Sequence, residues 1–253
     1  MRGSPDADAP IRGQPVTDDD QDGGRVRSAS ADRQERARRT NAAWTAPLVY
    51  GTVRSLVRFV LWPYFRTRTA GREHIPASGQ VILAPVHRSN LDSLMLSPLT
   101  RRRLRALAKE SLFKLPPLGW VIASLGAFPV QRDSADRESM RVARELLADG
   151  NLLLVFPEGT RHEGDRVAEL FDGTAWLAAK TQSPVVPVGI AGTGEAMPTG
   201  ARLPRPTRVR IVVGPPIDPP EAKGARSALR NWTAGFTEAL QAAQDEAAER
   251  ARR

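Results

Sequence analysis

The sequence predicts an α/β fold: a mixed, mostly parallel sheet flanked by helices, with an amphipathic helix ahead of it. Short apolar runs alternate with segments of helical periodicity from about residue 80 onward, and such alternation is typical of a sheet covered on both faces. The 253 residues are enough for one sizeable core. We expect a tail over residues 1–42, the amphipathic helix over 43–66 and one domain over 67–253.

Residues 1–42 form the first of these parts. They are mostly Gly, Pro, Ser, Asp and Arg, with almost no large apolar side chains. Such a segment buries too little surface to offset the entropy lost on ordering, so we expect it to be disordered. It also lacks the apolar central region of a signal peptide.

Residues 43–66 have the pattern of an amphipathic helix, with Arg54 and Arg58 on the side opposite the apolar stripe. That stripe consists of Val49, Val53, Leu56, Val57, Val60 and Tyr64. Two arginines near the middle of a spanning helix cost about 2.5–3.5 kcal/mol each, and roughly nine apolar residues return only about 0.3–0.6 kcal/mol apiece. A membrane span is therefore unfavourable.

A helix lying in the membrane interface fits this segment better. Trp44 and Trp62 would sit at headgroup level, and Arg54 and Arg58 would face anionic lipid. We expect a peripheral or monotopic protein on the cytoplasmic face of the cell membrane. The alternative is a helix packed on the protein's own core.

The remaining segments alternate between strands and helices. Strands are predicted near 80–86, 104–108, 127–130, 151–156, 184–190 and 208–213. Helices are predicted from about residue 91, before residue 127, from Asp133 or Ser134 to Gly150, over 173–182 and from about Ser227.

Composition limits the chemistry. The chain has no cysteine, which excludes disulfides, thiolate metal sites and a cysteine nucleophile. Its three histidines lack metal-ligand spacing, so we propose no metal site. The formal charge of +9 favours phosphate-rich partners, whether nucleic acid, anionic lipid or phosphorylated substrates. No nucleic-acid recognition motif accompanies this charge, so we expect no nucleic-acid partner.

Unusual polar residues follow three of the predicted strands. His87 and Asp92 follow the first, Arg132 follows the strand ending at residue 130, and a turn over residues 157–161 follows the strand near 151–156. The carboxyl ends of neighbouring parallel strands meet at one edge of a sheet, where open α/β sheets bind ligands. Imidazole exchanges protons near neutral pH, and a nearby carboxylate can fix its tautomer. Arginine binds phosphate through two parallel hydrogen bonds.

These motifs, in order, resemble the four sequence blocks of the glycerolipid acyltransferase family, and the bacterial 1-acylglycerol-3-phosphate acyltransferases are the most similar type. The blocks are His87-x4-Asp92, Gly126-Ala-Phe-Pro-Val-Gln-Arg132, Phe156-Pro-Glu-Gly-Thr-Arg161 and Val186-Pro187-Val188. They cover about residues 70 to 195, half of the chain.

The resemblance implies transfer of a fatty acyl group from acyl-CoA or acyl carrier protein to the sn-2 hydroxyl of lysophosphatidic acid, without a cofactor. His87 would be the base and Asp92 its partner. Pro187 would shape the acyl-donor side. The residues implied to bind the acceptor are Lys109, Arg132, Glu158, Gly159, Thr160 and Arg161.

The residues themselves favour direct transfer over a covalent acyl-enzyme. The sequence has no G-x-S-x-G motif and no cysteine. A thioester is already activated, so a hydroxyl acceptor needs positioning and a base. Two alternatives remain: an acyltransferase for glycerol 3-phosphate or another lysophospholipid, and a non-catalytic protein that binds acyl-CoA or a lipid surface.

Overall fold

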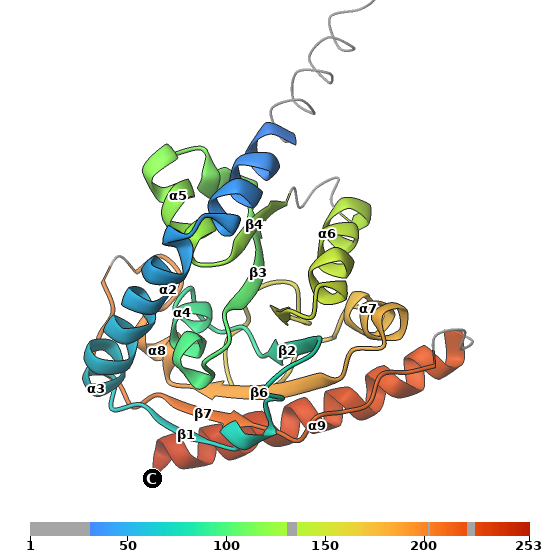
Figure 1. The fold of residues 1–253 in the computed structure, drawn as a ribbon. Helices are drawn as coiled ribbons and strands as arrows, with labels where there is room; N and C mark the ends of the chain where they lie inside the picture. Colours follow the sequence, from blue (N-terminus) through green and yellow to red (C-terminus); the bar gives the residue numbers. More distant parts are fainter. Residues whose placement is uncertain (1–30, 131–135, 202, 222–225) are drawn as a thin grey trace, which may run out of the picture.

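A computed structural model describes residues 31–130, 136–201, 203–221 and 226–253 (Figure 1). The centre is a seven-stranded sheet with the strand order β1-β7-β6-β2-β5-β3-β4. The pairing of β6 with β7 is antiparallel and every other pairing is parallel. The strands are β1 (Arg68–Ala70), β2 (Val81–Pro85), β3 (Leu104–Lys109), β4 (Ala127–Val130), β5 (Leu152–Leu154), β6 (Val185–Ala191) and β7 (Arg210–Val213). The predicted fold class is confirmed.

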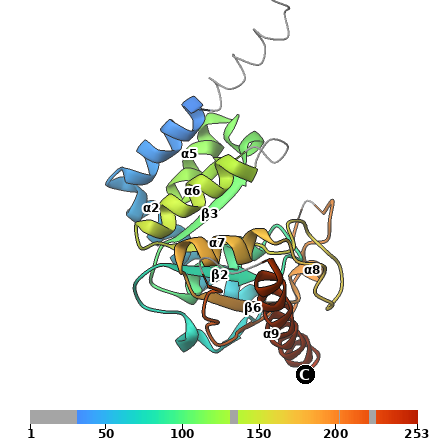
Figure 2. The same cartoon turned by 90° about the vertical axis from the view of Figure 1, so that its right-hand side faces the viewer.

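Helices cover both faces of this sheet. Figure 2 shows α6, α7 and α9 on one side and α2 on the other. The helices are α2 (Thr45–Leu56), α3 (Trp62–Tyr64), α4 (Asp92–Leu96), α5 (Pro116–Ser124), α6 (Asp136–Ala148), α7 (Gly173–Thr181), α8 (Thr193–Ala196) and α9 (Arg226–Arg252). Every residue of β2, β5 and β6 is buried, as expected of parallel strands covered on both faces.

The sheet brings the polar loops to one edge. β2, β5 and β3 are parallel neighbours, so the loops after their last residues leave from the same side. Arg210, the first residue of β7, pairs with Ala191, the last residue of β6, and therefore lies at this edge too. We call it the carboxyl edge.

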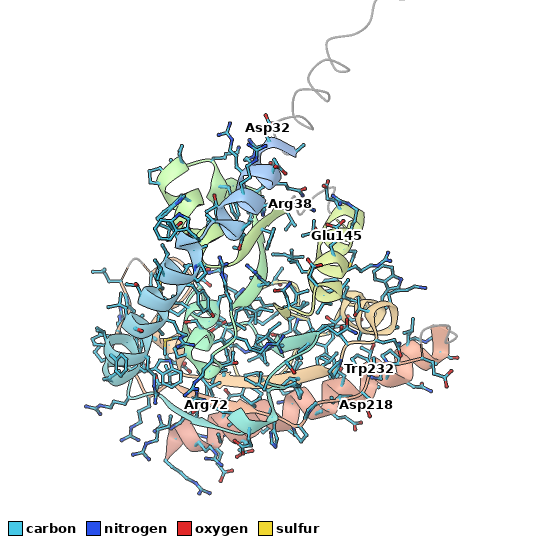
Figure 3. All side chains as sticks on the ribbon, viewed as in Figure 1. Asp32, Arg38, Arg72, Glu145, Asp218 and Trp232 are labelled. Carbon is cyan, nitrogen blue, oxygen red and sulfur yellow. The ribbon has the colours of Figure 1, made fainter. Side chains whose placement is uncertain are left out.

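The expectation of disorder up to residue 42 is wrong for residues 31–42, which are helical; residues 1–30 lie outside the described residues. Arg38 reaches Glu145 of α6 at 2.6 Å (Figure 3), and Arg33 forms an ion pair of 2.5 Å with Glu110. Asn41 is buried and donates a hydrogen bond to the Ala127 carbonyl. Arginines suggested a solvated tail, but Arg33 and Arg38 instead form ion pairs that connect this helix to the domain.

The predicted helix over 43–66 is present as α2, a π-helical turn η1 (Val57–Leu61) and α3, but its faces differ from those predicted. Val57 and Trp62 are buried, and the Trp62 Nε1–H donates to the Met95 carbonyl at 3.1 Å. Trp62 therefore cannot contact a membrane, which corrects the prediction. The π-helical turn explains the error, because it sets successive buried positions five residues apart instead of three or four.

Candidate active site

The His87–Asp92 pair lies in the loop between β2 and α4. His87 Nδ1 lies 2.9 Å from Asp92 Oδ2. A carboxylate only accepts, so Nδ1 carries the proton of this hydrogen bond, and Nε2 of the neutral ring is left as a proton acceptor. The predicted orientation of these two side chains is confirmed.

Asp92 is fixed from several directions. Its carboxylate is fully buried, and Oδ2 also accepts hydrogen bonds from the backbone N–H groups of Arg88 at 2.7 Å and Ser89 at 2.8 Å. Phe156 stacks on the His87 ring, with 3.9 Å between ring centroids and 22° between planes. Ring and carboxylate are thus held before any ligand arrives, which is what a positioned acid–base group requires.

Glu158 has a structural place that sequence reasoning missed. Its buried carboxylate forms an ion pair of 2.8 Å with the buried guanidinium of Arg88. It also accepts from the backbone N–H of His87 at 2.7 Å and of Ala168 at 2.9 Å. The carboxylate is enclosed by protein groups, so the expectation that it contacts substrate is wrong. Glu158 therefore connects the His87 loop to the loop after β5. The sequence signal for this role was Arg88, a charged residue directly after His87 that could pair with a buried carboxylate.

The turn over residues 157–161 lies beside His87. Gly159 has φ +69°, a left-handed conformation that favours glycine. A Cβ at this position would lie 2.6 Å from the Phe171 ring. Thr160 and Arg161 are exposed, with Thr160 Oγ1 at 3.1 Å from His162 Nε2.

Two further residues, Lys109 and Arg132, were predicted to bind the acceptor. Lys109 is exposed at the last position of β3, at the carboxyl edge. Arg132 lies outside the described residues.

Pro187 does not lie where the sequence analysis placed it. It is a buried residue in the middle of β6, paired with Ala84 of β2. Its ring packs against Gly214, where an added Cβ would meet Pro187 Cγ at 2.9 Å. A side chain inside the sheet cannot shape a donor site at its edge, so this prediction is wrong.

A largely apolar cavity of about 450 Å³ opens beside His87. Its walls come from α2, the His87 loop, β3, α5 and β4, and they include Leu94, Leu104, Ala106, Leu107, Ile122, Leu125 and Val130. Tyr50 and Arg54 also line it. Burial raises the pKa of Tyr50, whose hydroxyl accepts a hydrogen bond from the Leu104 N–H. An apolar cavity beside a proton acceptor suits a ligand with a hydrocarbon part.

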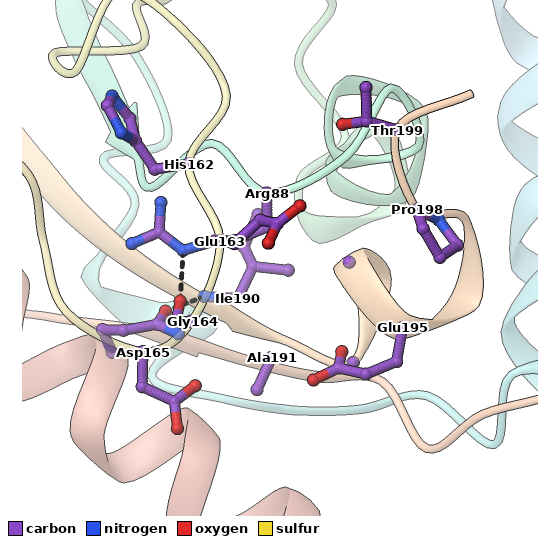
Figure 4. Close-up of a pocket in the computed structure, with 13 residues that line it drawn as sticks. Arg88, His162, Glu163, Gly164, Asp165, Ile190, Ala191, Glu195, Pro198 and Thr199 are labelled. Carbon is purple, nitrogen blue, oxygen red and sulfur yellow. Dashed lines mark hydrogen bonds between the residues drawn. The ribbon is translucent and has the colours of Figure 1, made fainter. Parts of the chain in front are cut away.

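A second cavity, of about 300 Å³, lies behind Arg88 (Figure 4). The Arg88 Nε–H donates to the Gly164 carbonyl at 2.8 Å. Glu163, Asp165 and Glu195 surround this space. Arg88 thus lines this cavity and also forms the ion pair with Glu158.

Two features are absent from the residues that the structure describes. Within these ranges, no three side chains among His, Asp and Glu are grouped to hold a metal ion. No helix in the same part of the chain has the length and apolar character needed to cross a membrane.

Fold and site together define an α/β domain with a hydrogen-bonded His87–Asp92 pair at the carboxyl edge of its sheet. Residues 66–191 match the family model described as Acyltransferase, and the chain belongs to this acyltransferase family. It is 31% identical over 161 residues to a chloroplastic 1-acyl-sn-glycerol-3-phosphate acyltransferase from Brassica napus, covering 62% of this chain and 46% of that protein. A Bacillus subtilis 1-acyl-sn-glycerol-3-phosphate acyltransferase is 26% identical, covering 67% of this chain and 81% of that one.

A solved structure agrees with these relatives. The 1-acyl-sn-glycerophosphate acyltransferase of Thermotoga maritima superimposes with a TM-score of 0.66 at 26% identity, covering 82% of this chain and 85% of that chain. This chain spans about half the length of the plant relatives it matches. The family and the fold are therefore established for this domain.

Proposed function

We propose that this chain transfers a fatty acyl group from a thioester, acyl-CoA or acyl carrier protein, to the sn-2 hydroxyl of lysophosphatidic acid, giving phosphatidic acid. The observation that carries the proposal is the hydrogen-bonded His87–Asp92 pair at an apolar cavity. The names of the relatives from Bacillus subtilis and Thermotoga maritima support this acceptor.

The proposed reaction is direct transfer with His87 as general base. Nε2 takes the proton of the acceptor hydroxyl while that oxygen bonds to the thioester carbonyl carbon. The C–S bond then breaks, and the imidazolium returns the proton to the departing thiolate. Asp92 stabilises the imidazolium, because its buried carboxylate already faces Nδ1. Base catalysis of this kind contributes about 10²–10⁴-fold in rate.

The cavity beside His87 is the proposed site of the acyl chain. Leu107, Ile122 and Leu125 supply apolar walls, and Phe156 connects the cavity to the His87 ring. For the acceptor phosphate we propose Arg161 and Arg132, with Lys109 at the same edge. Gly159 would let substrate approach the main chain.

We also propose that the domain works on the cytoplasmic face of a membrane, with α2 and α5 against the lipid. Large apolar side chains are exposed on these two contacting helices and on the loop before each: Trp44, Leu48, Leu56, Leu115, Leu118 and Trp120. Arg58 is exposed near them, with its guanidinium over the Trp62 ring at 4.6 Å, and would face headgroups. Arg54 points inward to the Thr100 carbonyl, so we no longer assign it to the membrane.

The test is to incubate the purified chain with an acyl-CoA and lysophosphatidic acid and to follow the release of free thiol. We expect turnover that needs both substrates and that His87→Ala abolishes. Glycerol 3-phosphate and lysophosphatidylcholine, offered as rival acceptors, test the head group. Full turnover by a folded His87→Ala protein would refute the proposed base.

A further inference from the structure

A second group of basic residues lies away from His87, in an open cleft of about 810 Å³ between β1, β7 and the end of α9. We call it the arginine cleft. Its arginines are Arg66, Arg68, Arg208, Arg210, Arg250 and Arg253. None of them belongs to the motifs that resemble the acyltransferase blocks.

Arg210 is the buried centre of this cleft, with 8% of its surface exposed. Its Nε–H donates to the Arg250 carbonyl in the last turn of α9 at 3.2 Å, and Nη1 donates to the Arg66 and Val209 carbonyls at 2.9 Å. Arg66 has φ +46°, an uncommon conformation for a residue with a side chain. The backbone therefore fixes the Arg210 guanidinium in place.

The positive charge of the cleft is only partly neutralised. Glu246 and Glu249, the two carboxylates lining it, pair with Arg250 and Arg253. Within the described residues, no carboxylate lies within 4.0 Å of the guanidinium groups of the other four arginines. Arg68 and Arg210 are partners in register on the parallel strands β1 and β7, so two like charges are held on neighbouring strands and repel each other. Burial, and then Arg68 and Arg208, lower the pKa of Arg210.

This arrangement favours a bound anion. A buried charge without a counter-charge costs free energy that an anionic ligand would recover. Arginine guanidinium groups converging on one space are suited to phosphate, because each donates parallel hydrogen bonds and stays charged.

The position of the cleft indicates where the phosphate comes from. Arg210 lies at the carboxyl edge of the sheet, as does the His87 loop. Arg66 follows α3 by two residues, and the exposed Phe59, Val60 and Tyr64 lie in η1 and α3. The cleft thus continues the exposed apolar surface of the N-terminal helices, and Figure 1 shows β1, α3 and the end of α9 on one side of the molecule.

We propose that the arginine cleft is a second phosphate-binding site, separate from the acceptor site, and that it binds the headgroup phosphate of an anionic lipid. A phosphate of a soluble compound, such as the acyl donor, has the same chemistry, and the experiment separates the two sources. Binding is measured directly, so the proposal does not depend on acyl transfer.

The test uses the exposed arginines of the cleft and leaves Arg210 in place. The double variant Arg68→Ser, Arg208→Ser is compared with a control, Lys180→Ser, Arg230→Ser, which removes the same charge from exposed positions on α7 and α9. Each protein is titrated with pyrophosphate and sedimented with vesicles of phosphatidylcholine alone or mixed with phosphatidylglycerol.

We expect the cleft variant to bind the anionic vesicles roughly thirty-fold more weakly than the control. Each of the two arginines contributes about 1 kcal/mol near an anionic surface, and about 1.4 kcal/mol corresponds to a tenfold change in affinity. The cleft variant should also lose saturable pyrophosphate binding. Loss of pyrophosphate binding with unchanged vesicle binding would assign the site to a soluble phosphate compound and overturn the lipid source. If the two variants behave alike with both probes, no phosphate site exists in the cleft.

Discussion

At the scale of single residues, Asp92 shows how little freedom the proposed base has. Its Oδ2 binds His87 Nδ1 and two backbone N–H groups. Asp92→Asn would keep an amide oxygen facing these three donors, so Nδ1 would still carry its proton, but the negative charge that stabilises the imidazolium would be lost. We expect kcat to fall by about 10²–10⁴-fold with little change in the affinity for acyl-CoA. Thiol release measures this, with the exposed Asp218→Asn as a control. Wild-type kcat in Asp92→Asn would show that the charge of the carboxylate is unimportant.

Glu158 illustrates which roles a sequence motif leaves open. The Phe-Pro-Glu-Gly-Thr-Arg block marks residues 156–161 as functional, yet pattern alone does not say which side chains face inward. In the structure, Glu158 is buried and pairs with Arg88, whereas Thr160 and Arg161 are exposed to solvent. The His87–Asp92 pairing, by contrast, was predictable, because five positions at a strand-to-helix junction keep both side chains within reach of each other.

The substitution Glu158→Ala tests whether the buried ion pair with Arg88 stabilises the fold. The change leaves the Arg88 guanidinium buried without its counter-charge, which typically costs about 3–5 kcal/mol. We expect a loss of that size in the free energy of unfolding, measured by urea denaturation. Glu163→Ala, at an exposed position on the same loop, should change it by less than about 0.5 kcal/mol. Equal effects of the two changes would contradict the assignment.

At the scale of elements, the sequence predicted well those strands that are formed by continuous apolar runs. The apolar runs that became β2, β5 and β6 are continuous and buried, so their type was clear. β1 was not predicted, because a three-residue edge strand such as Arg68–Ala70 has no apolar run. The helix over 31–42 was missed because its anchors are polar, as with Asn41, whose Oδ1 accepts from Arg103 and Arg105.

The cavity between β3, α2 and α5 gives a prediction about chain length. Ala106 of β3 lines it, and a phenyl ring at that position would fill part of its volume. For Ala106→Phe we expect a ten- to hundredfold lower kcat/KM with a palmitoyl thioester and near-normal turnover with a hexanoyl thioester. Ala228→Phe, at an exposed position on α9, is the matched control. A uniform loss across chain lengths would mean that the acyl chain lies elsewhere.

At the scale of the whole molecule, Figure 1 shows α2, α3, β1 and the end of α9 on one side, and these elements carry exposed apolar residues and the arginine cleft. Composition predicted an affinity for anionic surfaces from the charge of +9. It could not place that charge, because Arg66 and Arg68 lie about 140 residues before Arg208 and Arg210 in the sequence and are brought to them by the pairing of β1 with β7.

The proposed orientation on a membrane predicts which tryptophans lipid can reach. Trp44 is 79% exposed and Trp120 47% exposed near the proposed lipid face, whereas Trp176 and Trp232 are half-buried on the helices of the opposite face. Brominated phospholipids quench only indole rings that enter the bilayer interface. On vesicles made with them, we expect the wild-type fluorescence to be quenched, and the quenching to be lost in Trp44→Phe, Trp120→Phe. It should persist in Trp176→Phe, Trp232→Phe, which keeps the two interfacial rings. If quenching were lost in Trp176→Phe, Trp232→Phe and kept in Trp44→Phe, Trp120→Phe, the face formed by α6, α7 and α9 would lie against the lipid. That result would refute the proposed orientation.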